Sequence, residues 1–185
     1  MFASFSELKK ALAELESDGA LQASIRDALN ILSNALKNGN KILIAGNGGS
    51  AAEADHFAAE IVGRYTRERK GYPALSLSAS AASVTAIAND YGYKEVFARQ
   101  VEALGVSGDV FFGLSTSGNS DNLVRAVEVG KSKGLHTVCL LGKGGGKLAA
   151  LADTALVVPG QTTARIQELH LLIIHTLCDE LEKNF

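Results

Sequence analysis

Two short loops rich in glycine, serine and asparagine carry the residues with the clearest potential for chemistry. The first is Gly46-Asn47-Gly48-Gly49-Ser50, and the second is Ser115-Thr116-Ser117-Gly118-Asn119-Ser120. Each loop follows an apolar, strand-like run and precedes a helix-like run, so its backbone N–H groups lie at the positive end of a helix, where anions bind. Serine and threonine hydroxyls add small hydrogen-bond donors. The pair predicts a phosphorylated, polyhydroxylated ligand, and neither loop has a nucleotide-binding pattern of the GxxxxGK[ST] or GxGxxG type.

A histidine and a glutamate lie one helical turn apart soon after the first loop. His56 and Glu60 are spaced i, i+4, so they share one face of the predicted helix. The spacing alone leaves two interpretations open. The two residues form an ordinary hydrogen-bonded pair on a helix surface, or they face the loop and take part in catalysis or metal binding.

The predicted C-terminal helix carries Gln167 and His175 in a stripe that is otherwise apolar, and embedded polar groups need partners. A metal ion held by His56, Glu60, Gln167 and His175 would satisfy all four, and imidazole and carboxylate ligands suit Zn²⁺. Eight residues of helix rise about 12 Å, so Gln167 and His175 must lean toward one ion unless a second chain supplies some ligands. His170, on an adjacent part of the same face, is expected to be an ordinary hydrogen-bonded helix histidine.

Two further groups of polar residues are secondary candidates. The pair Asn89-Asp90 lies at a break between two predicted helical pieces and is expected to reach the same cleft as the two loops. A basic cluster follows the helix that carries His56. It is expected to form a solvated surface, with phosphate contact in a neighbouring subunit as the alternative, and it consists of Arg64, Arg67, Arg69 and Lys70.

Short apolar runs alternate with helical patterns through most of the chain. Five runs rich in Val, Ile, Leu or Phe predict buried strands at Lys41–Ala45, Pro73–Leu77, Asp109–Leu114, His136–Leu141 and Thr154–Val158. Helices are predicted between and after them at Ala51–Arg67, Ser80–Ala88, Lys94–Leu104, Asn119–Lys133, Lys147–Leu151 and Thr163–Lys183. The alternation predicts a doubly wound, five-stranded parallel sheet in an α/β/α sandwich. Ligands bind beyond the carboxyl ends of such strands, where both loops lie.

Apolar residues at helical spacing predict two further helices within residues 1–38, separated at Gly19 and stopped by Gly39. Residues 39–185 are predicted to form the α/β core and the C-terminal helix of a single domain that spans 1–185. Ser50 and Glu53 resemble a capping box at the start of the helix after the first strand. The apolar stripes of the N-terminal helices need cover from their own domain or from a second copy, and we expect an oligomer.

The overall composition excludes several classes of protein. The 185 residues carry a formal net charge of −2 with scattered Lys and Arg, which argues against nucleic-acid binding. No apolar run approaches the roughly 20 residues of a membrane span. The N-terminal segment lacks the apolar region of a signal peptide, so a cytoplasmic protein is expected. Cys139 and Cys178 match no metal or redox spacing and are predicted to be buried thiols.

In combination, these motifs resemble the phosphoheptose isomerases, which belong to the sugar isomerase (SIS) class. The resemblance covers essentially the whole chain. It rests on the two glycine-containing loops together with His56 to Glu60, Gly63-Arg64-Tyr65, Asn89-Asp90 and Ala164-Arg165-Ile166-Gln167-Glu168 through His175. The combined pattern is specific, whereas either loop alone would be weak. The resemblance implies the SIS fold with an N-terminal helical extension.

The resemblance further implies interconversion of sedoheptulose 7-phosphate and D-glycero-D-manno-heptose 7-phosphate, the first step toward the ADP-heptose of lipopolysaccharide and other surface glycans. It implies cytoplasmic homotetramers with active sites at subunit interfaces and one zinc ion per subunit. The implied metal ligands are His56, Glu60, Gln167 and His175, and Glu60 and His175 are the implied acid–base pair. The implied substrate contacts are Asn47, Gly48, Gly49, Glu60, Asn89, Asp90, Ser115, Thr116, Ser117, Ser120 and Gln167.

Three alternative functions remain open on the sequence. One relative of this family binds a bacterial replication initiator and lacks the catalytic pair, whereas this chain has both Glu60 and His175. Sugar-phosphate-sensing SIS modules of regulators accompany a DNA-binding domain, of which the sequence shows no sign. An isomerase of another sugar phosphate, such as a pentulose or hexulose phosphate, would need the same residues.

Overall fold

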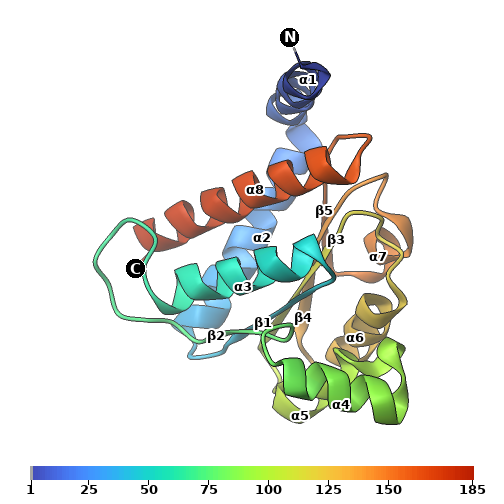
Figure 1. The fold of residues 1–185 in the computed structure, drawn as a ribbon. Coiled ribbons are helices and arrows are strands. Elements are labelled where there is room, and N and C mark those ends of the chain that lie inside the picture. The colour runs from blue at the N-terminus through green and yellow to red at the C-terminus, as the bar shows by residue number, and fades with distance from the viewer. Residues whose placement is uncertain (1) are drawn as a thin grey trace.

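The computed structural model describes residues 2–185. Its centre is a five-stranded, all-parallel sheet in the order β2-β1-β3-β4-β5 (Figure 1). The strands are β1 (Ile42–Gly46), β2 (Ala74–Ser76), β3 (Val110–Ser115), β4 (His136–Leu141) and β5 (Thr154–Val157). The doubly wound α/β fold predicted from the sequence is confirmed. Because β1 lies between β2 and β3, the direction of winding reverses between β1 and β3.

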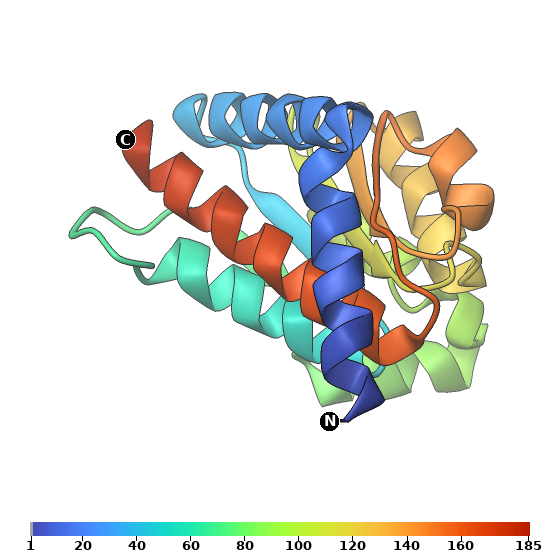
Figure 2. The ribbon, with the colours of Figure 1, turned by 90° about the horizontal axis from the view of Figure 1, so that it is seen from above.

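Helices cover both faces of the sheet (Figures 1 and 2). One face packs against α2 (Gly19–Lys37), α3 (Gly49–Val62) and α8 (Thr163–Lys183). The other packs against α5 (Ala98–Leu104), α6 (Asp121–Ser132) and α7 (Gly146–Leu151). The helix α4 (Ala81–Tyr91) and the short 3₁₀ helix η1 (Tyr93–Glu95) lie beside this second layer, and α4 has no buried residue.

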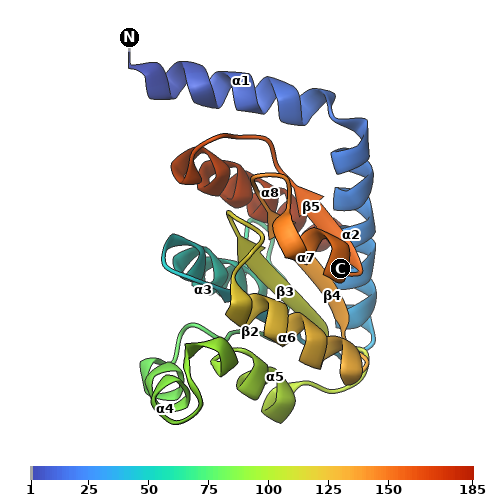
Figure 3. The same cartoon turned by 90° about the vertical axis from the view of Figure 1, so that its right-hand side faces the viewer.

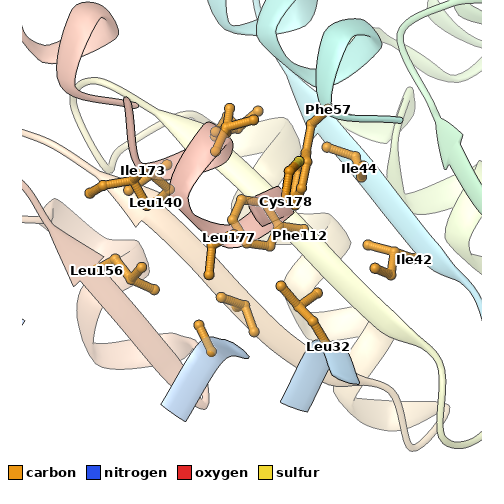
Figure 4. Close-up of a cluster of buried hydrophobic side chains, with 14 of the residues drawn as sticks. Leu32, Ile42, Ile44, Phe57, Phe112, Leu140, Leu156, Ile173, Leu177 and Cys178 are labelled. Carbon is orange, nitrogen blue, oxygen red and sulfur yellow. The ribbon is translucent and has the colours of Figure 1, made fainter. Parts of the chain in front are cut away.

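Successive strand residues point to opposite layers, which explains the apolar runs in the sequence. In β3, Phe112 joins the core beneath α3 and α8, whereas Phe111 joins the core on the other face. Phe57 of α3 packs edge-on against Phe112 with ring centroids 5.1 Å apart, and Leu177 of α8 lies in the same cluster (Figure 4). Each fully buried side chain of this size contributes about 2 kcal/mol by removing apolar surface from water. This core fixes α3 and α8 against the sheet.

Several helix boundaries differ from the sequence prediction. The two N-terminal helices are separated at Asp18, whose carboxylate accepts hydrogen bonds from the first N–H groups of α2, so Gly19 is the first residue of that helix. The prediction of a capping box at Ser50 and Glu53 was wrong. Gly48 is the N-cap of α3, and its positive φ of 58° places the helix start two residues earlier than Ser50 requires. Gly39 follows the end of α2 with a φ of 80°, as predicted.

The first helix, α1 (Ala3–Ser17), extends across the end of the molecule and is mostly uncovered (Figure 3). Ala11 is its one buried residue, while Phe2 and Phe5 are exposed. Among residues 2–185, none of the helices combines the length and apolar character that crossing a bilayer requires. Cys139 and Cys178 are buried free thiols, as predicted, and burial raises the pKa of each to about 12.

Candidate active site

The two polar loops lie side by side where the winding of the sheet reverses. Gly46 at the end of β1 is paired with Leu114 of β3, so residues 47–48 and 116–120 emerge from neighbouring strands at the same edge. Each loop leads directly into a helix, α3 or α6, and the first N–H groups of a helix have no partner within it. The edge therefore presents two helix N-termini to an anionic ligand.

A reciprocal pair of amides joins the first loop to the start of α6, the helix that follows the second loop. Asn47 Nδ2 donates to Asn122 Oδ1 at 3.0 Å, and Asn122 Nδ2 donates to Asn47 Oδ1 at 2.9 Å. The Tyr93 hydroxyl also donates to Asn47 Oδ1 at 2.8 Å. Asn122 is buried in the first turn of α6, so this network holds the first loop at a fixed distance from the second.

The second loop is organised by its own hydroxyl groups. Ser115 Oγ lies 3.2 Å from Ser120 Oγ and accepts the N–H of Gly118 at 3.1 Å. Ser117 Oγ accepts the N–H of Asn119 at 3.2 Å. Gly118 has a φ of 66°, and a Cβ there would collide with the carbonyl of Gly145. The loop is thus a tight turn that gathers three serines around the start of α6.

The helices α3 and α8 run parallel on the same face of the sheet, which brings their polar residues together at several places along their length (Figures 1 and 2). At their N-terminal ends, the side-chain amide of Gln167 lies against Gly49, where a Cβ would be 2.3 Å from Gln167 Nε2. The absence of a side chain at Gly49 therefore lets Gln167 reach the first loop. Farther along are the pair His56 and His175, and beyond the end of α3 is Glu182.

The two predicted histidines face each other directly. His56 Nε2 and His175 Nε2 are 2.8 Å apart, and their rings meet edge to face with centroids 5.1 Å apart. Glu60 Oε1 lies 3.7 Å from His56 Nε2. The His56 side chain is 40% exposed and that of Glu60 is 21% exposed, so both are accessible from the surface of this chain. The arrangement places a carboxylate and two imidazoles within reach of one small molecule.

The four residues predicted as metal ligands are not all brought together within one chain. His56, Glu60 and His175 form one group, whereas Gln167 lies at Gly49, two helical turns before His175. In the part of the chain that the structure describes, no three His, Cys, Asp or Glu side chains are close enough to hold a metal ion on their own. The donor types still suit Zn²⁺, since two facing imidazole nitrogens satisfy each other only when one is protonated, whereas a cation accepts both lone pairs.

His170 is not the hydrogen-bonded helix histidine that the sequence predicted. It is fully buried between α8 and α3, and neither ring nitrogen has a hydrogen-bond partner within residues 2–185. Its Nδ1 lies 3.8 Å from Glu53 Oε2, which is also unpartnered in this part of the chain. Glu53 is thus turned into the helix–helix interface and does not cap the start of α3.

The remaining candidates lie at the borders of this site. Asn89 and Asp90 are exposed residues in the last turn of α4, so the predicted helix break at these positions was wrong, and Asn89 Nδ2 donates to Asp90 Oδ1 at 2.8 Å. They precede Tyr93, which contacts the first loop through Asn47. The predicted solvated surface was wrong for Arg69, whose side chain is only 11% exposed and is paired with Glu182.

Three residues that contact the site were not assigned a role from the sequence. They are Tyr65, which stacks on His175, and Tyr93 and Asn122, which hold Asn47. Asn122 and Asn47 are 75 positions apart, so spacing along one element gives no signal for their contact. Tyr65 lies within the helix predicted at Ala51–Arg67 but beyond the observed end of α3, and the family motif that contains it is the signal available in the sequence.

Comparisons with known proteins show the family of the chain. The family model for the SIS domain matches residues 4–142. The phosphoheptose isomerase of Helicobacter pylori strain Shi470 is 56% identical over 178 residues, which cover 96% of this chain and 91% of that protein.

Two solved structures are also similar. The phosphoheptose isomerase of Neisseria gonorrhoeae superposes with a TM-score of 0.92 at 43% identity, covering 98% of this chain and 96% of that one. The phosphoheptose isomerase of Francisella tularensis has a TM-score of 0.92 at 36% identity, with coverages of 98% and 95%. The parallel sheet, the paired loops and the histidine–glutamate group thus occur in a chain that belongs to the phosphoheptose isomerase family of SIS-domain proteins.

Proposed function

We propose that this protein is an aldose–ketose isomerase that interconverts sedoheptulose 7-phosphate and D-glycero-D-manno-heptose 7-phosphate, the first step toward the activated heptose of surface glycans. The single observation that carries the proposal is the pairing of an anion-binding edge with a carboxylate–imidazole group. The loops at residues 47–50 and 115–120 meet at one edge of the sheet, and Glu60 and His175 lie on the two helices beside it.

The phosphate of the sugar is assigned to the second loop. Ser115, Ser117 and Ser120 gather around the N-terminus of α6, which supplies hydroxyl and N–H donors for a dianion. Asn47, Gly48 and Gly49 of the first loop, with Gln167 against Gly49, are assigned to the sugar hydroxyls, and Asn89, Asp90 and Thr116 complete the contacts. Binding energy from the phosphate orients the reacting carbons, which lie at the other end of the sugar.

The reaction moves a proton between C1 and C2 through an enediol, so it needs a base near the carbon acid and an acid for the oxygens. Glu60 is assigned as the group that removes the proton from one carbon and returns it to the other. His175 is assigned to proton transfer at the sugar oxygens, including ring opening. His175 Nε2 lies 2.8 Å from His56 Nε2, so it faces the group that contains Glu60.

Zinc is the proposed cofactor, with His56, Glu60, Gln167 and His175 as its ligands. When bound, it would act as a Lewis acid toward the carbonyl and enediolate oxygens. Chelation followed by activity and metal-content measurements tests this assignment. Loss of activity that returns with added zinc supports it, whereas a metal-free protein with the full rate would limit the four residues to acid–base work and substrate contact.

A homotetramer with active sites at subunit interfaces is part of the proposal. Gln167 lies two turns from His175 in one chain, so a neighbouring copy would have to complete the ligand set. Exposed apolar side chains offer surfaces for such contacts, including Phe2 just before α1 and Phe5 on α1, which are 76% and 63% exposed. A sedimentation mass equal to one chain would contradict this part of the proposal.

A panel of sugar phosphates tests the substrate assignment. The values of kcat/KM for sedoheptulose 7-phosphate, ribulose 5-phosphate and fructose 6-phosphate are compared under one set of conditions. The proposal predicts the highest value for the heptulose phosphate. A higher value for a shorter sugar would keep the isomerase chemistry but replace the substrate.

A further inference from the structure

The segment that follows α3 is tied to the last turn of α8 by one carboxylate. Glu182 Oε1 accepts the N–H of Tyr65 at 2.7 Å, and Oε2 accepts the N–H groups of Thr66 at 2.9 Å and Arg67 at 2.8 Å. The Glu182 side chain is only 2% exposed. Burial alone would raise its pKa, but the hydrogen bonds from these three N–H groups and from the Thr66 hydroxyl lower it to about 2. The carboxylate is therefore ionised and fixes three consecutive backbone positions.

Arg69 bonds both to Glu182 and to the end of α3, and we call Glu182 and Arg69 together the clamp. Its Nε donates to Glu182 Oε1 at 3.1 Å. Its two terminal nitrogens donate to the carbonyls of Glu60 at 2.7 Å, Ile61 at 2.9 Å and Gly63 at 2.8 Å. Carbonyls in the last turn of a helix have no partner within the helix, so one guanidinium satisfies them and neutralises the buried carboxylate. The helix end that carries Glu60 is thus linked to Glu182.

The clamp also sets the position of the Tyr65 ring. This ring stacks on the imidazole of His175 with centroids 5.4 Å apart and an interplanar angle of 25°. The His175 ring also contacts His56, and these two rings are arranged edge to face. The second side-chain torsion of a histidine is broad, so a stacked neighbour restricts an otherwise free ring. Glu182 holds the backbone position from which this ring projects.

We propose that Tyr65, anchored through its N–H by Glu182, is a positioning residue that holds the His175 imidazole in the orientation facing His56. The inference rests on the proposed role of His175 in the isomerase reaction. Tyr65 and Glu182 would then affect catalysis by fixing the orientation of the His175 ring. Arg69, which links the end of α3 to Glu182, would keep Glu60 in a fixed position relative to His175.

Nuclear magnetic resonance of the intact protein labelled with ¹³C at histidine Cε1 tests the stacking without any substrate. The chain has four histidines, so the spectrum is simple, and loss of one signal in a His175→Gln variant assigns His175. A stacked aromatic ring shifts the imidazole proton signals. We expect Tyr65→Leu to move the His175 signal and Tyr65→Phe to preserve it, while exposed His136 stays unchanged in both variants. An unmoved His175 signal in Tyr65→Leu overturns the proposal.

Kinetics of the same pair separate positioning from binding. Tyr65→Leu is expected to lower kcat by about tenfold with KM within about twofold, because small misplacement of a catalytic group slows the chemical step. Tyr65→Phe should retain kcat, since it keeps the ring. Equal losses in both variants would assign the effect to the phenol hydroxyl and overturn the positioning role. Failure of the isomerase function itself would appear as inactive wild-type protein, with the spectroscopic result still decisive.

A charge-removing variant tests the anchor. Glu182→Gln retains the shape but replaces one acceptor oxygen with a donor, so we expect the His175 signal to shift in the same direction as in Tyr65→Leu. Glu180→Gln is the matched control, because Glu180 lies on the same helix and pairs at the surface with Lys183. A folded Glu182→Gln protein with an unshifted His175 signal would remove Glu182 from the proposal.

Discussion

Strand β3 has a buried polar residue at each end, Asp109 immediately before it begins and Ser115 where it finishes. Asp109 Oδ1 accepts the N–H of Lys41, and Asp109 Oδ2 accepts the N–H of Val106 and lies 2.5 Å from Lys41 Nζ. All of these partners come from the chain itself. Although burial alone would raise the pKa of Asp109, the hydrogen bonds from Lys41 and its neighbours lower it below the usual value.

The polar residues at the other end of the strand have different partners. Ser115 is bonded within its own short loop, to Gly118 and Ser120, and that loop leads to a helix N-terminus. At the amino edge, where the strands begin, the polar groups join elements of the fold. At the carboxyl edge, where the strands end, N–H and hydroxyl donors are left for a ligand. The comparison teaches that burial of a polar residue is not itself a sign of function. The partners of the residue show whether it joins parts of the fold or is left to bind a ligand.

The largest expected effect is on catalysis and comes from Glu60→Gln. Removal of the proposed base should lower kcat by about 10³-fold, at the middle of the range for general acid–base groups. The melting temperature should stay within about 3 °C, because the side chain is partly exposed and its loss leaves no buried charge. Glu68→Gln is the matched control, since that exposed carboxylate follows α3 without facing the histidines. Normal turnover in Glu60→Gln would remove Glu60 from the mechanism.

The next effect is on stability and comes from Asp109→Ala at the amino edge. Loss of this carboxylate leaves two buried N–H groups without their acceptor and should lower the free energy of unfolding by about 3 kcal/mol, measured by urea denaturation. Asp109→Asn keeps one acceptor oxygen and should cost less. The kcat per folded molecule should be unchanged in both variants. A large fall in kcat with intact stability would break the distinction between the two edges.

A moderate effect on substrate binding is expected from Ser117→Asp. The added carboxylate would face the phosphate assigned to this loop, and charge repulsion should raise KM by about 10- to 100-fold with a smaller change in kcat. Ser117→Ala serves as the control for loss of the hydroxyl alone. An unchanged KM would place the phosphate elsewhere and leave the second loop without its proposed ligand.

The smallest expected effect is on the free energy of unfolding at low pH, and it comes from Asp153 at the amino edge. Its carboxylate accepts the N–H of Thr137 at 2.9 Å and pairs with Lys131. Burial alone would raise the pKa of Asp153, but the bonds from Lys131 and Thr137 lower it. Because the folded-state pKa is lowered, the contribution to stability is present above about pH 4 and is lost as the pH falls through the folded value.

The comparison of wild type with Asp153→Asn isolates that contribution. Above pH 5, wild type should be more stable by less than about 1 kcal/mol, because solvent screens this partly exposed group. The two proteins should converge as the pH falls below about 4, as measured by thermal unfolding. A difference that grows toward low pH would contradict the assigned direction of the pKa.

The sheet and most helices could be predicted from the sequence because apolar periodicity records burial directly. The runs around Leu43 and Phe111 are buried on both sides, which the continuous apolar pattern anticipates. Helix ends were less predictable. The pattern extends α3 to Arg67, but the helix stops at Val62 because Glu182 and Arg69, which lie far apart in the sequence, hold the following residues in another conformation.

The candidate site was predictable in its residue types but not in its assembly. The i, i+4 spacing of His56 and Glu60 follows from helix geometry, and so does the separation of Gln167 from His175. The contacts of Asn122 with Asn47 and of Tyr65 with His175 depend on how distant elements pack. Local sequence patterns do not predict such contacts, so these partners were identified only from the three-dimensional structure.

The most direct test of the assigned chemistry is to incubate the purified, zinc-supplied protein with sedoheptulose 7-phosphate and follow the sugar by NMR. The carboxyl edge of the sheet with Glu60 and His175 predicts that signals of the aldoheptose 7-phosphate appear until equilibrium is reached. A folded protein that produces no aldoheptose phosphate under these conditions would contradict the assignment of this edge as a heptose-phosphate isomerase site.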